Sequence, residues 1–149
     1  MIAARLVLAA ALVGAGATGV EAACTISASG VSFGAYDVFS ASPTDSTGSV
    51  TYRCGNSDKD ITITISKGSS ATFSPRTLKQ GSESLNYNLF RDAGYTLIWG
   101  DGTSGTSTYF IKNPPNSADV VLTVYARTPA AQDVSAGSYS DSVVVTIEY

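Results

Sequence analysis

The side chains that could carry acid–base chemistry in this sequence are a few aspartates, and no histidine accompanies them. Because the 149 residues include no His, nucleophilic triads lack their usual base and metal sites lack their commonest ligand. Four carboxylates could in principle pair for glycoside hydrolysis: Asp101, Asp119, Asp133 and Asp141. Most of them occur in turn or loop sequences, where Asp is expected for backbone reasons. The sequence predicts neither an enzyme nor a metal or cofactor site.

The cysteines Cys24 and Cys54 are the other residues with reactive side chains. A metal pair or a reactive thiol is the weaker interpretation, since neither has a histidine or a second cysteine near it in the sequence. An even number of cysteines in an exported protein favours a disulfide. Closing a loop of roughly thirty residues should stabilise the fold by roughly 3–4 kcal/mol in the chain-entropy model.

Export is indicated by residues 1–22, which have the pattern of a signal peptide. Its parts are the positive n-region at Arg5, the apolar h-region Leu6–Val13, the cleavage site Val20-Glu21-Ala22 and a second site at Ala15-Gly16-Ala17. A transmembrane helix is the weaker interpretation, because the apolar run is short and glycines interrupt it. We expect one exported domain, residues 23–149, that passes through the periplasm to the cell surface.

Composition narrows the classes of partner. The formal net charge is −3 and charged residues make up only 14% of the chain, so no basic face is available for nucleic acid. Ser, Thr, Gly and Val are plentiful, as in strands that are joined by tight turns.

Alternation of apolar and polar residues predicts short strands along the whole mature chain. Ile61–Ser66 is the clearest, with three Ile on one face and Thr and Ser on the other. The remaining predicted strands are Cys24–Phe33 with a kink at Gly30, Ser49–Cys54, Leu85–Phe90, Tyr95–Trp99, Tyr109–Ile111, Val120–Ala126 and Gly137–Tyr149. Ser40–Gly48 and Lys67–Gly81 are expected to be irregular. With no helix of ten residues or more, the pattern is typical of an immunoglobulin-like antiparallel β-sandwich.

The last strand poses the functional question. Val143, Val145, Ile147 and Tyr149 share one face, and no turn or returning strand follows them in the sequence. So apolar a strand needs a neighbour on each side. We expect one of these neighbours to come from another polypeptide, and backbone from this same chain on both sides would argue against that expectation.

An ordered set of short motifs carries a family resemblance. The motifs are Phe33-Gly34-x-Tyr36-Asp37, Cys54, Arg76, Leu85-x-Tyr87-x-Leu89-Phe90, Ile98-Trp99-Gly100-Asp101-Gly102, Val124-Tyr125-Ala126-Arg127-x-Pro129 with Gln132, and Gly137-x-Tyr139-x-Asp141-x-Val143. Together they resemble the spore coat protein U domain, which also forms the subunits of archaic chaperone–usher pili. One departure is Ala126, where the family usually has Gly before the Arg.

The resemblance implies an immunoglobulin-like domain that lacks one strand. A periplasmic chaperone fills the gap first, and an N-terminal extension of the neighbouring subunit replaces it during assembly at an outer-membrane usher. On this interpretation Val143, Val145, Ile147 and Tyr149 line one edge of the groove and Ile26 lies at the other. Four or five large apolar side chains of a donor would add roughly 6–15 kcal/mol, as much as the stability of an ordinary domain.

Two alternatives stay open. The first is a self-sufficient secreted β-sandwich that binds a surface or glycan, with Tyr95, Trp99 and Tyr109 as candidate surface aromatics, although core packing is favoured for Trp99. The second concerns the role within a fibre, since a donor needs about ten residues before its first cysteine. Cleavage after Ala22 leaves only Ala23, which predicts a tip or minor subunit, unless the protein is a coat protein that does not polymerise this way or the start codon is misassigned.

Overall fold

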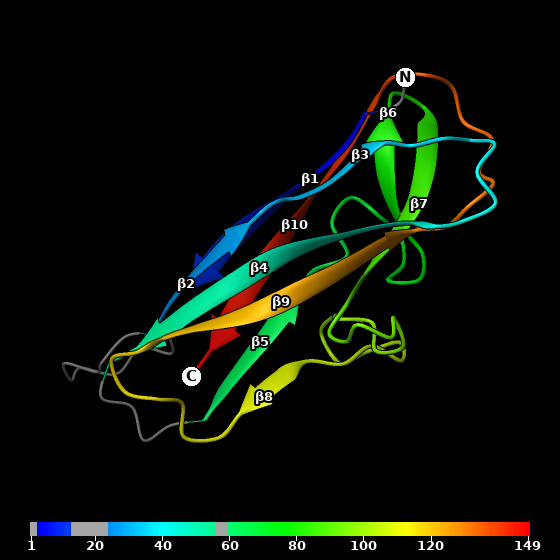
Figure 1. Ribbon diagram of the computed structural model, residues 1–149. Coiled ribbons are helices and arrows are strands. Elements are labelled where there is room, and N and C mark those ends of the chain that lie inside the picture. The colour runs from blue at the N-terminus through cyan, green and yellow to red at the C-terminus, as the bar shows by residue number, and fades with distance from the viewer. Residues whose placement is uncertain (1–2, 13–23, 56–59) are drawn as a thin grey trace.

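The computed structural model describes residues 3–12, 24–55 and 60–149, and these form ten β-strands without any helix (Figure 1). The strands are β1 (Ala3–Leu12), β2 (Cys24–Ser29), β3 (Val31–Ala35), β4 (Thr44–Cys54), β5 (Ile61–Ile65), β6 (Arg76–Gln80), β7 (Glu83–Phe90), β8 (Tyr109–Ile111), β9 (Asp119–Thr128) and β10 (Ser138–Glu148). Within these ranges no helix is long and apolar enough to cross a membrane. The two predicted cleavage sites lie outside the described residues.

The strands form two sheets that share β7. One sheet has the order β2-β4-β9-β7, and in the other β10 lies between β1 on one side and β5 and β6 on the other. The first part of β7 pairs with β6, and its last three residues, Asn88–Phe90, pair with β9. The pairings are antiparallel, with β1 and β10 as the exception among the named strands.

The core lies between the two sheets, where strands such as β5 turn their apolar faces inward as predicted. In β5, all three Ile are fully buried, while Thr62 and Thr64 are half-buried on the other face. Val50 and Tyr52 of β4, with Val124 and Ala126 of β9, bury the inner face of the opposite sheet. The immunoglobulin-like sandwich predicted from the sequence is confirmed.

Three predictions about the course of the chain were wrong. The loop expected at Ser40–Gly48 ends early, because β4 begins at Thr44 and pairs residue by residue with β9. The irregular stretch Lys67–Gly81 contains β6. Tyr95–Trp99 is not a strand, since only isolated bridges from Ile98 and Trp99 occur there. The kink predicted at Gly30 is confirmed, because it separates β2 from β3.

Residues of the predicted signal peptide form the strand β1. All ten of its residues pair in parallel with Ser138–Ile147 of β10, and Ala3–Leu6 also pair antiparallel with β3. Figure 1 shows β1 and β10 running side by side in the same direction. In residues 24–149, β10 and β3 therefore have a gap of one strand between them, and β1 occupies it.

Candidate functional site: a strand-acceptor groove

The candidate site is the position between β10 and β3. On its far side β10 is held by β5, which pairs with Val145–Glu148, and by β6, which pairs at Ser140. The near side of β10 and the facing edge of β3 both pair with β1. We call the position between β10 and β3, with the apolar side chains beneath it, the acceptor groove.

One expectation about this groove was wrong for the chain as a whole. We expected one side of β10 to lack a neighbour from this molecule, yet backbone of the same chain flanks both sides. The additional neighbour is β1, which comes from the segment predicted to be removed on export. In the whole chain both sides of β10 are paired, whereas in residues 23–149, which lack β1, one side of β10 has lost this partner.

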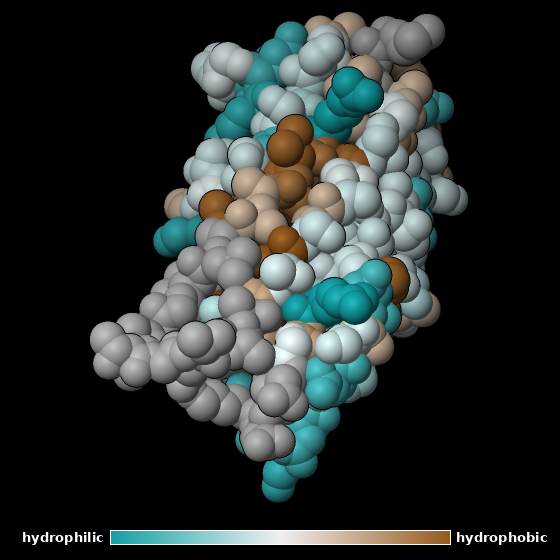
Figure 2. Space-filling view, turned by 90° about the vertical axis from the view of Figure 1, so that its left-hand side faces the viewer, coloured by the Kyte–Doolittle hydropathy of each residue, from teal (hydrophilic) through white to brown (hydrophobic). Residues whose placement is uncertain are grey.

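Over residues 3–9 the side chains of β1 alternate between solvent and the core. Ala4, Leu6 and Leu8 are buried, with Leu6 only 2% exposed, whereas Val7 is 59% exposed. In the parallel register Leu6 lies opposite Asp141 and Leu8 opposite Val143. Figure 2 faces the side of the molecule that carries β1 and β2 and shows hydrophobic residues across its middle. The strand thus fills the groove in the manner of a core strand, with one face inward.

Three of the predicted groove residues lie on the inner face of β10, whereas the opposite edge of the groove is formed by β3 and not by Ile26 of β2. Val143, Val145 and Ile147 point into the core from β10, and Ile26 is buried on β2 in the other sheet. Tyr149 lies just past the end of β10 and is half-buried against the core. The structure thus brings the β10 residues together under β1, while Tyr149 lies at the rim.

Sequence reasoning missed Gly30 as a groove residue. A Cβ at this position would lie 2.7 Å from the carbonyl oxygen of Leu6, so a side chain would collide with the backbone of β1. Val31 and Phe33 of β3 were missed as well, and both are buried next to β1. The isolated Gly in a strand pattern was a signal for close backbone approach, which we interpreted only as a kink.

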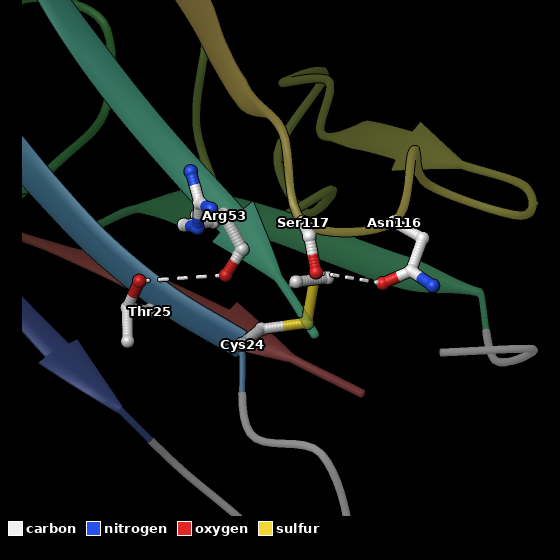
Figure 3. Close-up of a disulfide and its surroundings, with 6 residues drawn as sticks. Cys24, Thr25, Arg53, Asn116 and Ser117 are labelled. Atoms are coloured by element: carbon white, nitrogen blue, oxygen red, sulfur yellow. Dashed lines mark hydrogen bonds between the residues drawn. A yellow bond between two sulfur atoms is a disulfide. The ribbon is translucent and has the colours of Figure 1, made fainter. Parts of the chain in front are cut away.

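The predicted disulfide links the edge strand β2 to its neighbour β4, beside the groove. Cys24 and Cys54 face each other in the antiparallel register of β2 and β4, with Cα atoms 4.0 Å apart (Figure 3). The Ser117 N–H donates to the Cys54 carbonyl at 2.7 Å, which ties the segment before β9 to the same end of the sheet. The disulfide thereby anchors the N-terminal end of the folded domain.

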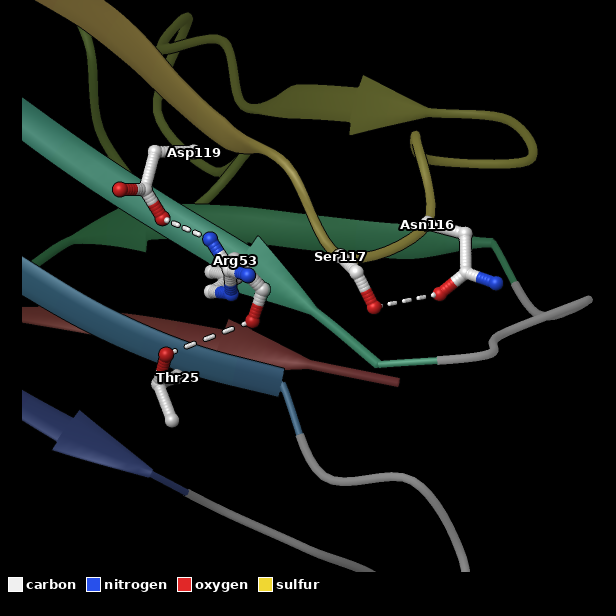
Figure 4. A network of polar contacts seen from close by, with 5 residues as sticks. All are labelled: Thr25, Arg53, Asn116, Ser117 and Asp119. Carbon is white, nitrogen blue, oxygen red and sulfur yellow. Dashed lines mark hydrogen bonds and ion pairs between the residues drawn. The ribbon is translucent and has the colours of Figure 1, made fainter.

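The polar contacts around the disulfide lie at the protein surface. Arg53 and Asp119 form an ion pair of 3.1 Å across β4 and β9, the Thr25 hydroxyl donates to the Arg53 carbonyl, and the Ser117 hydroxyl donates to Asn116 (Figure 4). Both charged side chains of the ion pair are more than half exposed, so it adds little stability. These contacts connect β2, β4 and β9 at this end of the sandwich.

The candidate acid residues have separate structural roles. Asp119 pairs with Arg53, Asp101 accepts hydrogen bonds from Thr103 within its own turn, and Asp133 is exposed. Asp141 is buried and accepts hydrogen bonds from Tyr87, Ser69 and the Ser142 N–H. Within the described ranges no three His, Cys, Asp or Glu side chains gather as a metal site would require.

The three candidate surface aromatics do not form one patch. Trp99 is fully buried and donates its indole N–H to the Ile63 carbonyl at 3.1 Å. Tyr109 packs on Trp99 with ring centroids 4.6 Å apart. Tyr95 instead packs edge-on against Phe90 and Tyr125. Core packing, the interpretation favoured for Trp99, is what the structure has.

Comparison with known proteins agrees with the motifs and the fold. The family model of the Spore Coat Protein U domain matches residues 9–146. The chain belongs to the spore coat protein U domain family. Protein U of Myxococcus xanthus is 32% identical over 132 residues, which cover 80% of this chain and 71% of that protein.

A solved structure is also similar to this chain. It is the CsuC–CsuE chaperone–tip adhesion subunit pre-assembly complex from the archaic chaperone–usher Csu pili of Acinetobacter baumannii. The TM-score is 0.53 at 22% identity, over 85% of this chain and 40% of the matched chain. At this identity the likeness establishes the fold, and the chain spans well under half the length of the chain it matches.

The motif residues of the spore coat protein U domain prove to be structural in this member. The Tyr36 hydroxyl donates to the Pro129 carbonyl at 2.7 Å and accepts from the Gln132 N–H. The Gln132 amide in turn exchanges two hydrogen bonds with the backbone of Asn86. These contacts tie the connector after β9 to β7 and to the end of β3. They thereby fix the end of β3, which forms one edge of the acceptor groove.

Arg76 and Asp141 form the polar core of the same domain. Arg76 is fully buried and donates to the carbonyls of Ser66 and Trp99 and to the side chain of Asn88. Burial lowers the pKa of Arg76 to about 10, so it stays charged at neutral pH. Burial and the nearby Asp141 carboxylate raise the pKa of Tyr87, so its hydroxyl remains a donor. The network braces β5, β6 and β10 beneath the groove.

Proposed function

We propose that this chain is the precursor of a structural subunit of a surface fibre or coat, and that its mature domain is completed by a β-strand from another polypeptide. One observation carries the proposal. The position between β10 and β3 is filled by β1, and β1 lies within the segment that the sequence predicts to be removed. A subunit of this kind needs an unpaired sheet edge and apolar side chains beneath it, and it needs no catalytic residue.

Loss of β1 would leave the domain with two unsatisfied edges. Ser138–Ile147 would lose the partner along one whole side, and Val31–Ala35 would lose its partner as well. The cover that Leu6 and Leu8 provide is worth roughly 3–6 kcal/mol, at about 1.5–3 kcal/mol for each side chain. That is a large fraction of the stability of an ordinary domain, so an external strand is strongly favoured.

The proposed partners follow from this geometry. A periplasmic pilus chaperone would supply the first strand, and neighbouring pilus subunits would replace it at an outer-membrane usher. Membership of the spore coat protein U domain family supports this assignment. The likeness to the subunit fold in the Csu chaperone–tip complex is consistent with it.

Co-expression tests the proposal. Residues 23–149 are exported to the periplasm with and without a co-expressed periplasmic pilus chaperone, with an empty vector as the control. We expect little soluble subunit alone and a stable one-to-one complex with the chaperone. Normal solubility and a cooperative melt of the lone domain would contradict the proposal and favour a self-sufficient sandwich that binds a surface or glycan.

A tip or minor position in the fibre is the finer part of the proposal. Its support is the sequence between the predicted cleavage sites and Cys24, where neither Ala23 nor Thr18–Ala23 makes an alternating apolar donor strand. Mass spectrometry of the mature N-terminus is the measurement. A mature protein that begins well before Thr18 would remove the basis for acceptor-only geometry.

A further inference from the structure

We infer that the leader segment Ala3–Leu12 is a temporary plug that closes the acceptor groove in cis until it is removed. The inference rests on the proposed function, because a plug matters only if other strands compete for the same groove. It adds an occupant that belongs to the chain itself, and it makes removal of the leader the event that opens the groove.

The pairing of β1 is that of an inserted strand. It begins where the Ala3 N–H donates to the Gly137 carbonyl at 3.0 Å and continues through ten residue pairs to Leu12 and Ile147. Over Ala3–Leu6 it also bridges to β3, so both edges of the groove are closed there. An external donor strand would need the same backbone groups, and the two occupants therefore exclude each other.

The register of β1 follows from its one charge. Leu6–Leu12 is apolar throughout, so its own hydrophobicity does not decide which face turns inward. A slip of one residue would exchange the two faces and bring Arg5 into the core beside Val7. Burial of an unpaired guanidinium is costly, and in the structure Arg5 is exposed while Leu6 is buried. The n-region charge of the leader thus selects the register.

The fit of the plug is close at one end and loose at the other. Gly30 admits the Leu6 carbonyl, and no larger residue would. Beyond Leu6, the side of β1 that faces β2 has no strand partner, and a hollow of about 430 Å³ remains there. Its lining comes from Arg5–Leu8 of β1 and from Ala28 and Gly30–Ser32 opposite. The hollow opens to solvent beside the exposed side chains of Arg5 and Val7, so β1 is less completely enclosed here than over Ala3–Leu6.

Hydrolysis of one peptide bond between β1 and Cys24 would release the plug. A leader peptidase adds water across that bond, which leaves a new carboxylate on the leader and a new amino group on the mature domain. From then on β1 is held only by its contacts in the groove. Its advantage as part of the same chain is lost, and a chaperone or subunit strand can replace it.

Cross-linking of the full chain, residues 1–149, tests the inference without a chaperone. The protein is refolded with its disulfide and carries Val7→Cys with Ser142→Cys, two exposed residues that the register places opposite each other. The control carries Val7→Cys with Glu148→Cys, which is six residues farther along β10 in the same exposed row. After mild oxidation we expect the first pair to cross-link in most molecules and the control pair at least tenfold less.

Two further variants check that the cross-link reports the groove. Adding Leu6→Asp should abolish the 7–142 cross-link, because it places a carboxylate in the core, whereas adding Ala9→Asp on the exposed face should leave it intact. Equal cross-linking of both pairs, absence of the 7–142 product, or indifference to Leu6→Asp would each overturn the inference. If the mature domain fails to bind a chaperone while the cross-link forms, only the proposed function is lost.

Discussion

At the scale of single residues, Arg76 shows why a charged side chain stands in a core of Ile, Val and Leu. It comes from the start of β6 and satisfies carbonyls of two other segments, at Ser66 and Trp99, that no strand pairs at those positions. Because the guanidinium has several donors in one plane, it can serve these acceptors at once. A buried polar group of this kind stabilises the fold through the acceptors that it keeps satisfied.

We expect Arg76→Lys to lower the free energy of unfolding by about 2–4 kcal/mol. A lysine cannot reach the separate acceptors around Arg76, and each buried carbonyl left without a donor costs about 1–3 kcal/mol. Urea unfolding of the full chain is the measurement. The matched control is Arg53→Lys, whose side chain is 52% exposed and which should change stability by less than about 0.5 kcal/mol. Equal effects of the two substitutions would contradict this role for Arg76.

Glu83 gives a second residue-level prediction, on pH. The Ser135 N–H, then the Tyr139 hydroxyl and the Ser135 hydroxyl, donate to its carboxylate and lower its pKa below the ordinary value of 4.5. A lowered pKa in the folded state contributes stability above the unfolded pKa, and this contribution is lost as the pH falls through the folded pKa.

The expected result for Glu83→Gln is a shallower fall of the melting temperature between about pH 5 and pH 3 than in the unmodified chain. Glu148→Gln serves as the control, because Glu148 is exposed at the end of β10. Thermal melts across that pH range decide the matter. A slope that Glu83→Gln leaves unchanged would mean that these hydrogen bonds do not hold the carboxylate in its ionised form.

At the scale of elements, the sequence predicts strands well where one face is apolar and poorly where both faces are polar or both are apolar. Ile61–Ile65 and Ser138–Glu148 alternate clearly and were found within one residue at each end. Thr44–Ser49 belongs to a strand because it pairs with β9, although its side chains are mainly hydroxyls and no alternation shows. Long-range pairing of this kind leaves no local trace.

The remaining differences have the same physical origin. Arg76–Gln80 was missed because a buried arginine opens the strand, and its partners are set by tertiary contacts. Tyr95–Trp99 looked like a strand, but Asp92 accepts hydrogen bonds from the N–H groups of Thr96 and Leu97 and turns the chain there. The acceptor groove was predicted from β10, whereas β1 was not, because a uniformly apolar leader carries no period-2 pattern.

Gly30 yields the prediction that belongs to the β2–β3 junction. Gly30→Ala should lower the stability of the full chain by about 1–3 kcal/mol, because the new methyl group meets the Leu6 carbonyl at 2.7 Å and β1 must shift. Gly94→Ala is the control, since a methyl group there meets only the ends of the Asp92 and Thr96 side chains, at 3.0 Å or more. Urea unfolding compares the two, and an equal loss in both would contradict the close approach of β1.

The disulfide provides a further prediction at this scale. Replacing Cys24 and Cys54 together by Ser should lower the free energy of unfolding by roughly 3–4 kcal/mol, the chain-entropy value for a closed loop of 30 residues. The pairing of β2 with β4 should persist, because β4 remains hydrogen-bonded to β2 on one side and to β9 on the other. Unfolding of the oxidised and doubly substituted chains measures the difference, and a change below about 1 kcal/mol would show that the bridge is dispensable.

At the scale of the whole molecule, the two sides of the sandwich are closed by different parts of the chain. β7 joins the two sheets on one side, whereas the side between β10 and β3 depends on a strand that the rest of the domain does not supply. The same apolar residues that make β10 a good core strand make it a liability without a neighbour. Under the proposed function, the stability of the domain and its assembly with other chains depend on the same groove.

This dependence predicts the effect of supplying the missing strand by design. Residues 23–149 can be extended after Tyr149 by an Asn-Gly hairpin turn and a strand with Val or Ile at each inward position. The extension would pair antiparallel with β10, as in a complete immunoglobulin-like domain. Four or five inward side chains should raise the free energy of unfolding by roughly 6–15 kcal/mol relative to the unextended domain.

The matched control carries the same extension with Asp at the inward positions, which cannot enter the groove without burying unpaired carboxylates. Thermal melts and binding of a dye that reports exposed apolar surface compare the three proteins. We expect the Val/Ile extension to make the domain soluble without a chaperone and to abolish dye binding, while the Asp extension leaves both unchanged. If the unextended domain is already as stable as the Val/Ile version, β10 has no deficit to fill, and strand donation loses its physical basis.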